Sequence, residues 1–218
     1  MSTTLIQKAR IAMESLGVYR GLLQDDVISR LHTLFEYMAK NPHDIIGTLS
    51  IYNEFYYTLM KKGKGCSLKD YIIEKIIFHD NIFATLVQES EMDYMANDIA
   101  QAAAQDLKYL GQIASIMPKD IEEMGTQLPH LSRWDVNGPF EIQEEYSEMV
   151  EVFRNTSSWD KCIHDLAHIH KKNGSGPWAQ FKGFIWEGED LQGVISLDPI
   201  RINNLIGYEI ERQKVIDN

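Results

Sequence analysis

Hydrophobic residues recur with the period of an α-helix along most of the chain. Side chains three or four positions apart lie on the same face of a helix, so each periodic stretch predicts a helix with one buried face. The helices expected from this spacing cover residues 5–16, 27–38, 44–59, 67–77, 81–89, 92–116, 140–153 and 159–170.

Capping residues define several of these boundaries. Asp25 or Asp26 is placed to cap the second helix, because a short polar side chain there accepts hydrogen bonds from the N–H groups of the first turn. Ser67, with Asp70 three residues later, forms an approximate capping box. Pro118 is expected to end the long helix that precedes it.

The pattern changes near the C-terminus. The segment Asn173–Pro177, with two glycines and a proline, is the strongest break in the chain. Residues 181–186 then predict a strand, residues 187–190 a turn and residues 194–197 a second strand. We therefore predict a mainly α fold, an irregular multi-helix domain with a small C-terminal β-hairpin.

This change of period divides the chain into three expected parts. A helical N-terminal domain covers residues 1–177, the β-hairpin covers 178–197, and a segment over 198–218 begins another helix. The chain stops in the middle of that last pattern. We therefore expect the sequence to be cut off before a further domain.

Composition and charge narrow the range of partners. The chain has 218 residues, of which 44% are hydrophobic, which is enough for a sizeable core. Its net charge of -11 repels phosphate backbones, so nucleic acid is not an expected partner. Two cysteines form no disulfide framework, and no segment approaches the roughly 20 apolar residues of a membrane span. We predict a soluble, cytoplasmic protein without membrane contact.

Sequence motifs for catalysis are missing from the chain. A P-loop needs Gly, four residues and then Gly-Lys-Ser/Thr, so that backbone amides surround the phosphates and the lysine reaches them. Lys61–Ser67 carries glycines and lysines at the wrong spacing. Acidic pairs such as Glu144–Glu145 are typical of solvated helix faces. We assign no catalytic residue, and the chain alone is not expected to be an enzyme.

His164 and His168 are the strongest candidates for metal ligands. They lie one helical turn apart and share a face, so both could reach one ion. Cys162 lies on another side, and no second Cys/His cluster supplies the remaining ligands. We favour a helix with partly exposed histidines and assign no metal site.

Three tryptophans surround the glycine-rich break. Trp159, Trp178 and Trp186 are predicted to pack the hairpin onto the helices. The alternative is that an exposed aromatic ring there anchors a partner.

The last third of the chain carries its most distinctive run of residues. Four short motifs follow one another there: Gly174-x-Gly176, Phe184-Ile185-Trp186, Asp198-Pro199-Ile200 and Leu205-Ile206-Gly207-Tyr208-Glu209. In this order they resemble a family of bacterial AAA-type P-loop ATPases known as domain of unknown function family 815. Gly17–Leu23 and Phe55–Tyr57 are also similar to that family. The resemblance covers most of the chain and is strongest after residue 173.

The resemblance implies that a nucleotide-binding loop follows soon after Asn218 and that the full-length protein binds ATP and Mg²⁺. It also implies that Leu205, Ile206, Gly207 and Tyr208 line the adenine pocket. Apolar side chains would cover the base, and the glycine would let the backbone come close. An ordinary turn before a helix is the alternative. Phosphate contacts are missing here, so no cofactor is expected in this chain by itself.

Three functions remain open at this point. The favoured one is a non-catalytic N-terminal module that recruits a protein partner or substrate to the ATP-driven motor, or regulates it. The second is self-association or a structural role in the ATPase ring. The third is an independent helical metal-binding protein, which rests only on His164 and His168.

Overall fold

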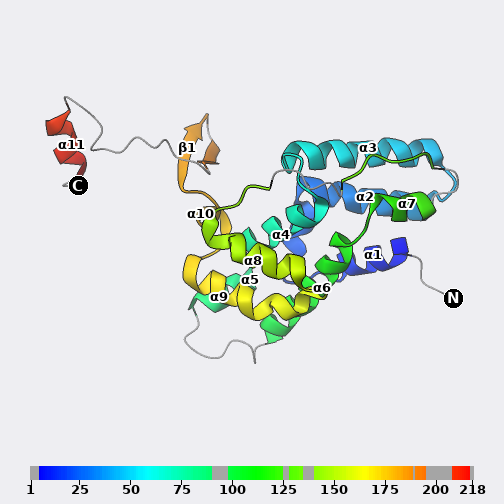
Figure 1. The fold of residues 1–218 in the computed structure, drawn as a ribbon, viewed down its shortest axis with the longest axis horizontal. Helices are drawn as coiled ribbons and strands as arrows, with labels where there is room; N and C mark the ends of the chain where they lie inside the picture. The colour runs from blue at the N-terminus through cyan, green and yellow to red at the C-terminus, as the bar shows by residue number, and fades with distance from the viewer. Residues whose placement is uncertain are drawn as a thin grey trace. The chain divides into compact units, whose positions relative to one another are not determined.

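The structure is a computed structural model that describes residues 5–89, 98–124, 128–134, 140–188, 190–194 and 208–216. The described part is mainly helical, with a small antiparallel hairpin near the C-terminus, and the predicted fold class is confirmed (Figure 1). Two compact units make up the chain, Met1–Ala179 and Gln180–Asn218. The three-part division expected from the sequence stays a prediction.

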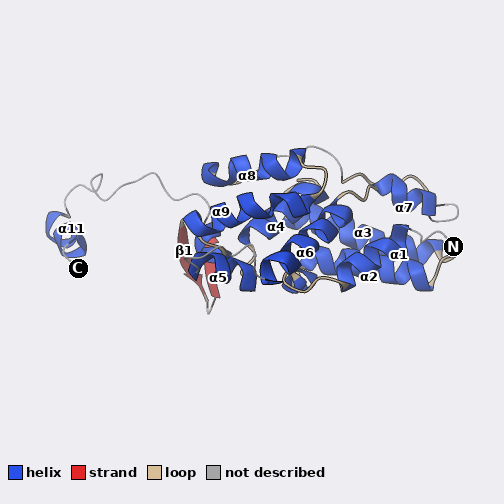
Figure 2. Cartoon of the chain, turned by 90° about the horizontal axis from the view of Figure 1, so that it is seen from below, coloured by secondary structure: helices blue, strands red, loops and turns tan. Residues whose placement is uncertain are grey.

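Helices that pack against one another account for most of the first unit. Before the hairpin, the described helices are α1 (Leu5–Glu14), η1 (Arg20–Gln24), α2 (Asp26–Lys40), α3 (Ile45–Lys62), α4 (Leu68–Phe78), α5 (Ile82–Glu89), α6 (Asp98–Ala114), α7 (Pro118–Met124), α8 (Glu144–Asn155), η3 (Trp159–Cys162), α9 (Ile163–Asn173) and α10 (Gly176–Gln180). α2 packs along α3 and α1, α9 packs on α5 and α8, and α4 contacts both α6 and α8 (Figure 2).

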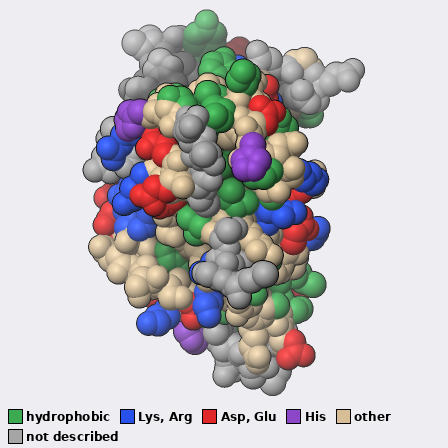
Figure 3. Space-filling model, turned by 90° about the vertical axis from the view of Figure 1, so that its right-hand side faces the viewer, with side chains coloured by type: hydrophobic (Ala, Val, Ile, Leu, Met, Phe, Trp, Pro, Cys, Tyr) green, Lys and Arg blue, Asp and Glu red, His purple; other side chains and the backbone are tan. Residues whose placement is uncertain are grey.

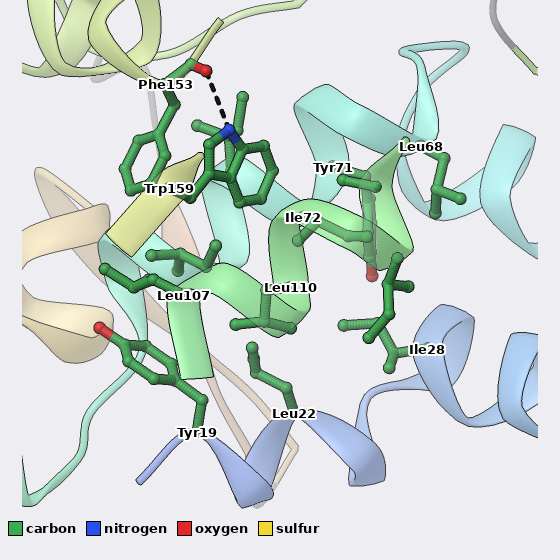
Figure 4. Close-up of a cluster of buried hydrophobic side chains, with 14 of the residues drawn as sticks. Tyr19, Leu22, Ile28, Leu68, Tyr71, Ile72, Leu107, Leu110, Phe153 and Trp159 are labelled. Atoms are coloured by element: carbon green, nitrogen blue, oxygen red, sulfur yellow. Dashed lines mark hydrogen bonds between the residues drawn. The ribbon is translucent and has the colours of Figure 1, made fainter. Parts of the chain in front are cut away.

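α6 runs through the middle of the hydrophobic core. Leu107 and Leu110 of this helix are buried among Leu22 of η1, Ile72 of α4 and Trp159 of η3 (Figure 4). Elements far apart in the sequence therefore bury their apolar faces against one helix. Removing this apolar surface from water is the main favourable term in folding.

The structure decides between the two expected caps of α2. Asp25 is the N-cap, because its Oδ1 accepts hydrogen bonds from the backbone N–H groups of Val27 at 2.9 Å and Ile28 at 3.2 Å. Asp26 is the first residue of the helix and pairs with Lys62 at 2.7 Å. The predicted cap of α4 is confirmed, since the Oγ of Ser67 accepts from the backbone N–H of the residue three positions on at 3.0 Å.

Two helix boundaries differ from the predictions. Pro118 follows α6 and is also the first residue of α7. A proline lacks a backbone N–H, and at this position the lack costs no stability because the N–H of the first helical residue has no hydrogen-bond partner within the helix. α8 begins at Glu144 rather than at residue 140, since Gln143 has extended backbone angles. Residues 92–97 of the expected long helix lie outside the described residues.

The hairpin consists of β1 (Gly183–Glu187) and β2 (Asp190–Val194), with Glu187 opposite Asp190 and Trp186 opposite Leu191. The prediction that the second strand begins at residue 194 was wrong. Only two residues connect the strands, and Gly188 has a φ of 66°, which a glycine adopts without strain. Residues 195–197 lie outside the described part, and α11 (Glu209–Ile216) follows later in the second unit.

Candidate functional site

The adenine-pocket residues expected from the family resemblance are only partly described. Leu205, Ile206 and Gly207 lie outside the described residues. Tyr208 directly precedes α11, and its side chain is exposed. The adenine pocket therefore stays a prediction.

The two candidate metal ligands lie on α9 with exposed side chains. His164 and His168 project from the helix surface one turn apart. Nowhere in the described part of the chain do three or more His, Cys, Asp or Glu side chains come together as a metal site would require. Cys162 is buried, and burial raises the pKa of its thiol. Its environment suits a packed, unreactive thiol.

The three tryptophans have different environments. Trp159 is buried between α6 and α8, so it belongs to the core of the helical unit. Trp178 and Trp186 are each 73% exposed. That they pack the hairpin onto the helices stays a prediction, and so does the alternative, an aromatic anchor for a partner.

Three neighbouring cavities form a trough on the helical unit. Its first cavity, of about 280 Å³, is lined by Lys69, Arg154 and Ser157 among others. Its central cavity, of about 340 Å³, is lined by Leu68 and Trp134 among others. The two cavities adjoin along α4, α6 and the end of α8.

A third cavity extends the trough in the other direction. It has a volume of about 260 Å³ and is lined by Lys119 and Arg133 among others. The first and central cavities share Lys69 and Ser115, and the central and third cavities share Met117. The three cavities therefore adjoin one another in a row, which we call the trough.

The trough exists because several helices end at the same place. α4 begins there after its Ser67 cap, while α6 ends there at Ala114. α8 ends nearby at Asn155, and α7 starts at Pro118. The Met117 N–H donates to the carboxylate of Asp120 at 2.7 Å and thereby fixes the turn between α6 and α7. Because four helices begin or end here, their side chains leave part of this space unfilled, and the trough results.

Two tryptophans form an apolar floor beneath the trough. Trp134 donates its indole N–H to the carbonyl of Ile116 at 3.3 Å, and Trp159 donates to the carbonyl of Phe153 at 3.0 Å (Figure 4). Both indoles are buried. Gly111 of α6 allows the close approach of Trp159, since a Cβ there would lie 3.1 Å from the ring. The floor is held by packing and by satisfied polar groups.

An ion-pair network holds one end of the trough. The Nε of Arg154 lies 2.8 Å from the Oδ1 of Asp70, and its Nη1 lies 2.8 Å from the Oε1 of Glu151. The Asp70 carboxylate raises the pKa of the Arg154 guanidinium. Lys69 donates from Nζ to the carbonyl of Arg154 at 3.0 Å. Among the described residues, Lys69 has no carboxylate partner.

The third cavity carries the other cationic end. The Oε1 of Glu122 accepts the backbone N–H of Leu131 at 2.6 Å and lies 3.1 Å from the Nδ1 of His130. Lys119 has no ion-pair partner within the part of the chain that the structure describes. Its ammonium therefore remains available to a ligand.

Charged side chains of both signs occur together on one face of the protein (Figure 3). On the face shown in Figure 3, basic, acidic and hydrophobic side chains are interspersed. The trough differs by its hollow form and by its cationic lining over an aromatic floor. Such a combination suits the binding of an extended chain, with polar groups that set its orientation.

Sequence reasoning identified Ser67 and Asp70 only as a cap and its partner, and it expected Trp159 to help pack the hairpin onto the helices. It missed Lys69 and Arg154 as parts of a binding surface. Asp70 and Arg154 are 84 positions apart, and no local pattern links them.

Comparison with protein-family models, with curated proteins and with solved structures finds no match to this chain. Among the described residues, no helix is both long and apolar enough to cross a membrane.

Proposed function

We propose that the chain is a partner-binding helical module that delivers a protein to an ATP-driven motor of the AAA type. The observation that carries the binding role is the trough, a row of three adjoining cavities with cations at both ends and an aromatic floor. Its cavities are individually small, but together they offer an elongated surface. A protein segment fits such a surface better than a compact small molecule does.

The connection to a motor rests on the family resemblance of the residues after 173. On that resemblance we propose that the whole gene product binds ATP and Mg²⁺, with Leu205 to Tyr208 against the adenine. A cytoplasmic location is proposed from the two cysteines, which form no disulfide framework. Reading the gene beyond Asn218 tests this part of the proposal directly. A Gly-rich loop ending in Gly-Lys-Ser/Thr should appear within the next few tens of residues. A reading frame without such a loop would remove the motor from the proposal and leave the binding module.

Site-specific crosslinking in cells tests the binding role. A photo-crosslinking phenylalanine derivative at Ser157 lies in the trough, and the same derivative at Lys8 of α1 serves as the matched surface control. We expect a discrete crosslinked protein from position 157 that is absent from position 8. The same crosslinked products from both positions, or none from the trough, would contradict a docking role.

Self-association is a second candidate, favoured by one observation on the hairpin. Trp186 and Leu191 lie directly opposite each other across the strands and are 73% and 42% exposed. A two-stranded hairpin is only marginally stable in water, so cover from a second copy would stabilise it. Light scattering of the wild type and of Trp186→Ser tests this role. A dimer that Trp186→Ser converts to a monomer would support it, and a wild-type monomer at high concentration would exclude it.

A further inference from the structure

We infer that the trough takes an extended acidic segment of a partner protein, with carboxylates toward both ends and an apolar residue between them. This inference rests on the proposed binding role of the trough and specifies its ligand. It follows from the order of charged and apolar groups along the depression.

The two ends of the trough are cationic. Lys69 and Arg154 line the first cavity, and Lys119 and Arg133 line the third. Of the described residues that line the three cavities, only Glu122 carries a carboxylate. The lining is therefore more basic than the chain as a whole, whose net charge is -11.

Internal pairing reduces the charge that Arg154 offers. Arg154 is already held by Asp70 and Glu151, so it contributes position and polarity more than net charge. Lys69 binds only a backbone carbonyl within the described part, and a carbonyl leaves its positive charge uncompensated. Lys69 is therefore the main attractive charge at this end, and Lys119 has the same role at the other.

The middle of the trough is apolar. Leu68, Ile116, Met117 and Trp134 line the central cavity. The indole N–H of Trp134 is already donated to a backbone carbonyl, so the cavity offers mainly its hydrophobic surface there. An apolar side chain would lose contact with water in this cavity, at a gain of about 25 cal/mol for each Å² buried.

The net charge of -11 favours a peptide over nucleic acid. A nucleic acid strand carries its charge on every phosphate, and those beyond the trough would face the acidic remainder of the chain. A peptide can place its carboxylates at the two cationic ends only. The charges at those ends thus select for position as well as for sign.

Fluorescence anisotropy with a labelled synthetic peptide tests the inference on the whole chain. The probe carries a Glu pair at each end and Leu-Ala-Leu between them, and the comparison peptides replace all Glu by Gln or by Lys. We expect binding of the Glu probe, with affinity lower by about tenfold or more for the Gln peptide and no binding of the Lys peptide. Equal affinity for the Glu and Gln peptides would overturn the inference.

Variants of the protein locate the binding on the trough. Lys69→Glu and Lys119→Glu should each lower the affinity for the Glu probe by about three- to tenfold, whereas Lys8→Glu on α1 should leave this affinity unchanged. Lys69→Met keeps the aliphatic stem without the charge and should weaken binding less than the reversal. Circular dichroism checks that each variant is folded. An equal loss in the Lys8→Glu control would refute binding in the trough.

A charge swap separates a specific contact from general repulsion. A peptide with Lys at one end and Glu at the other should bind one of the variants Lys69→Glu and Lys119→Glu more tightly than it binds the wild type. Which of the two variants gains affinity depends on the orientation of the peptide in the trough. If a single-stranded oligonucleotide binds more tightly than the acidic probe, and its binding also depends on Lys69 and Lys119, the inferred ligand would be nucleic acid and the acidic peptide would be ruled out. If position 157 crosslinks a protein in cells but the acidic probe does not bind, the docking role stands and only the ligand chemistry fails.

Discussion

Arg154 near the end of α8 and Asp70 in the first turn of α4 form an ion pair, with 2.8 Å between Nε and Oδ1 across 84 positions of sequence. The Asp70 side chain is 9% exposed, while that of Arg154 is 36% exposed. Asp70 also receives the hydroxyl hydrogen bond of Ser67 at 2.9 Å. The pair therefore connects the cap of one helix to the end of another beside the trough.

Asp70→Asn should lower the free energy of unfolding by about 1–3 kcal/mol, because the buried side chain loses a charge-assisted bond and Arg154 loses its closest partner. Urea denaturation measures the change. Glu151→Gln is the matched control, since it removes the exposed partner of the same guanidinium and should cost about 0.5 kcal/mol or less. Equal losses in the two variants would contradict the view that burial makes the Asp70 contact the stronger one.

Removing the cap of α2 should distinguish two adjacent aspartates. Asp25→Ala leaves two backbone N–H groups and the hydroxyl of Tyr71 without their acceptor, so we expect a loss of about 2 kcal/mol. Asp26→Ala removes an exposed pair with Lys62, which solvent screens, and should lower the stability much less. Thermal unfolding of both variants under identical conditions gives the comparison. A larger loss of stability in Asp26→Ala than in Asp25→Ala would contradict the assignment of Asp25 as the N-cap of α2.

Stability should fall as the pH drops below about 6.5 because of His170. Burial lowers the pKa of His170 to about 4 from its ordinary 6.5, while its Nε2 donates to the carbonyl of Ile77 at 3.0 Å. The unfolded chain therefore binds a proton more readily than the folded one. The full contribution is present above pH 6.5 and is lost between pH 6.5 and 4, by about 3 kcal/mol in total.

His170→Gln tests the origin of this pH dependence. The glutamine amide can still donate to Ile77 but does not titrate, so the variant should lose less stability between pH 7 and 5 than the wild type. Burial also lowers the pKa of His79, which acts in the same direction and remains in the variant. Chemical denaturation at several pH values gives both curves. Parallel curves would show that His170 does not control the change.

Much of the helical architecture followed from local patterns. The periodic stretches became helices, and Ser67 capped α4 as expected, because both depend on residues within one or two turns. The choice between Asp25 and Asp26 was not local, since Tyr71 of α4 donates to Asp25. The second strand was placed too late, because a two-residue connection sets its start through pairing with β1.

The sequence by itself determined the helical periodicity, the Ser67 cap, the acidic net charge and the order of motifs on which the ATPase proposal rests. Only the tertiary structure brought Lys69, Lys119 and Trp134 to one depression and buried Trp159 while leaving Trp186 exposed. The physical reason is the range of the forces involved. Helix formation and capping depend on neighbours a few residues away, whereas the trough arises where four helices end, and their meeting depends on how the whole core packs.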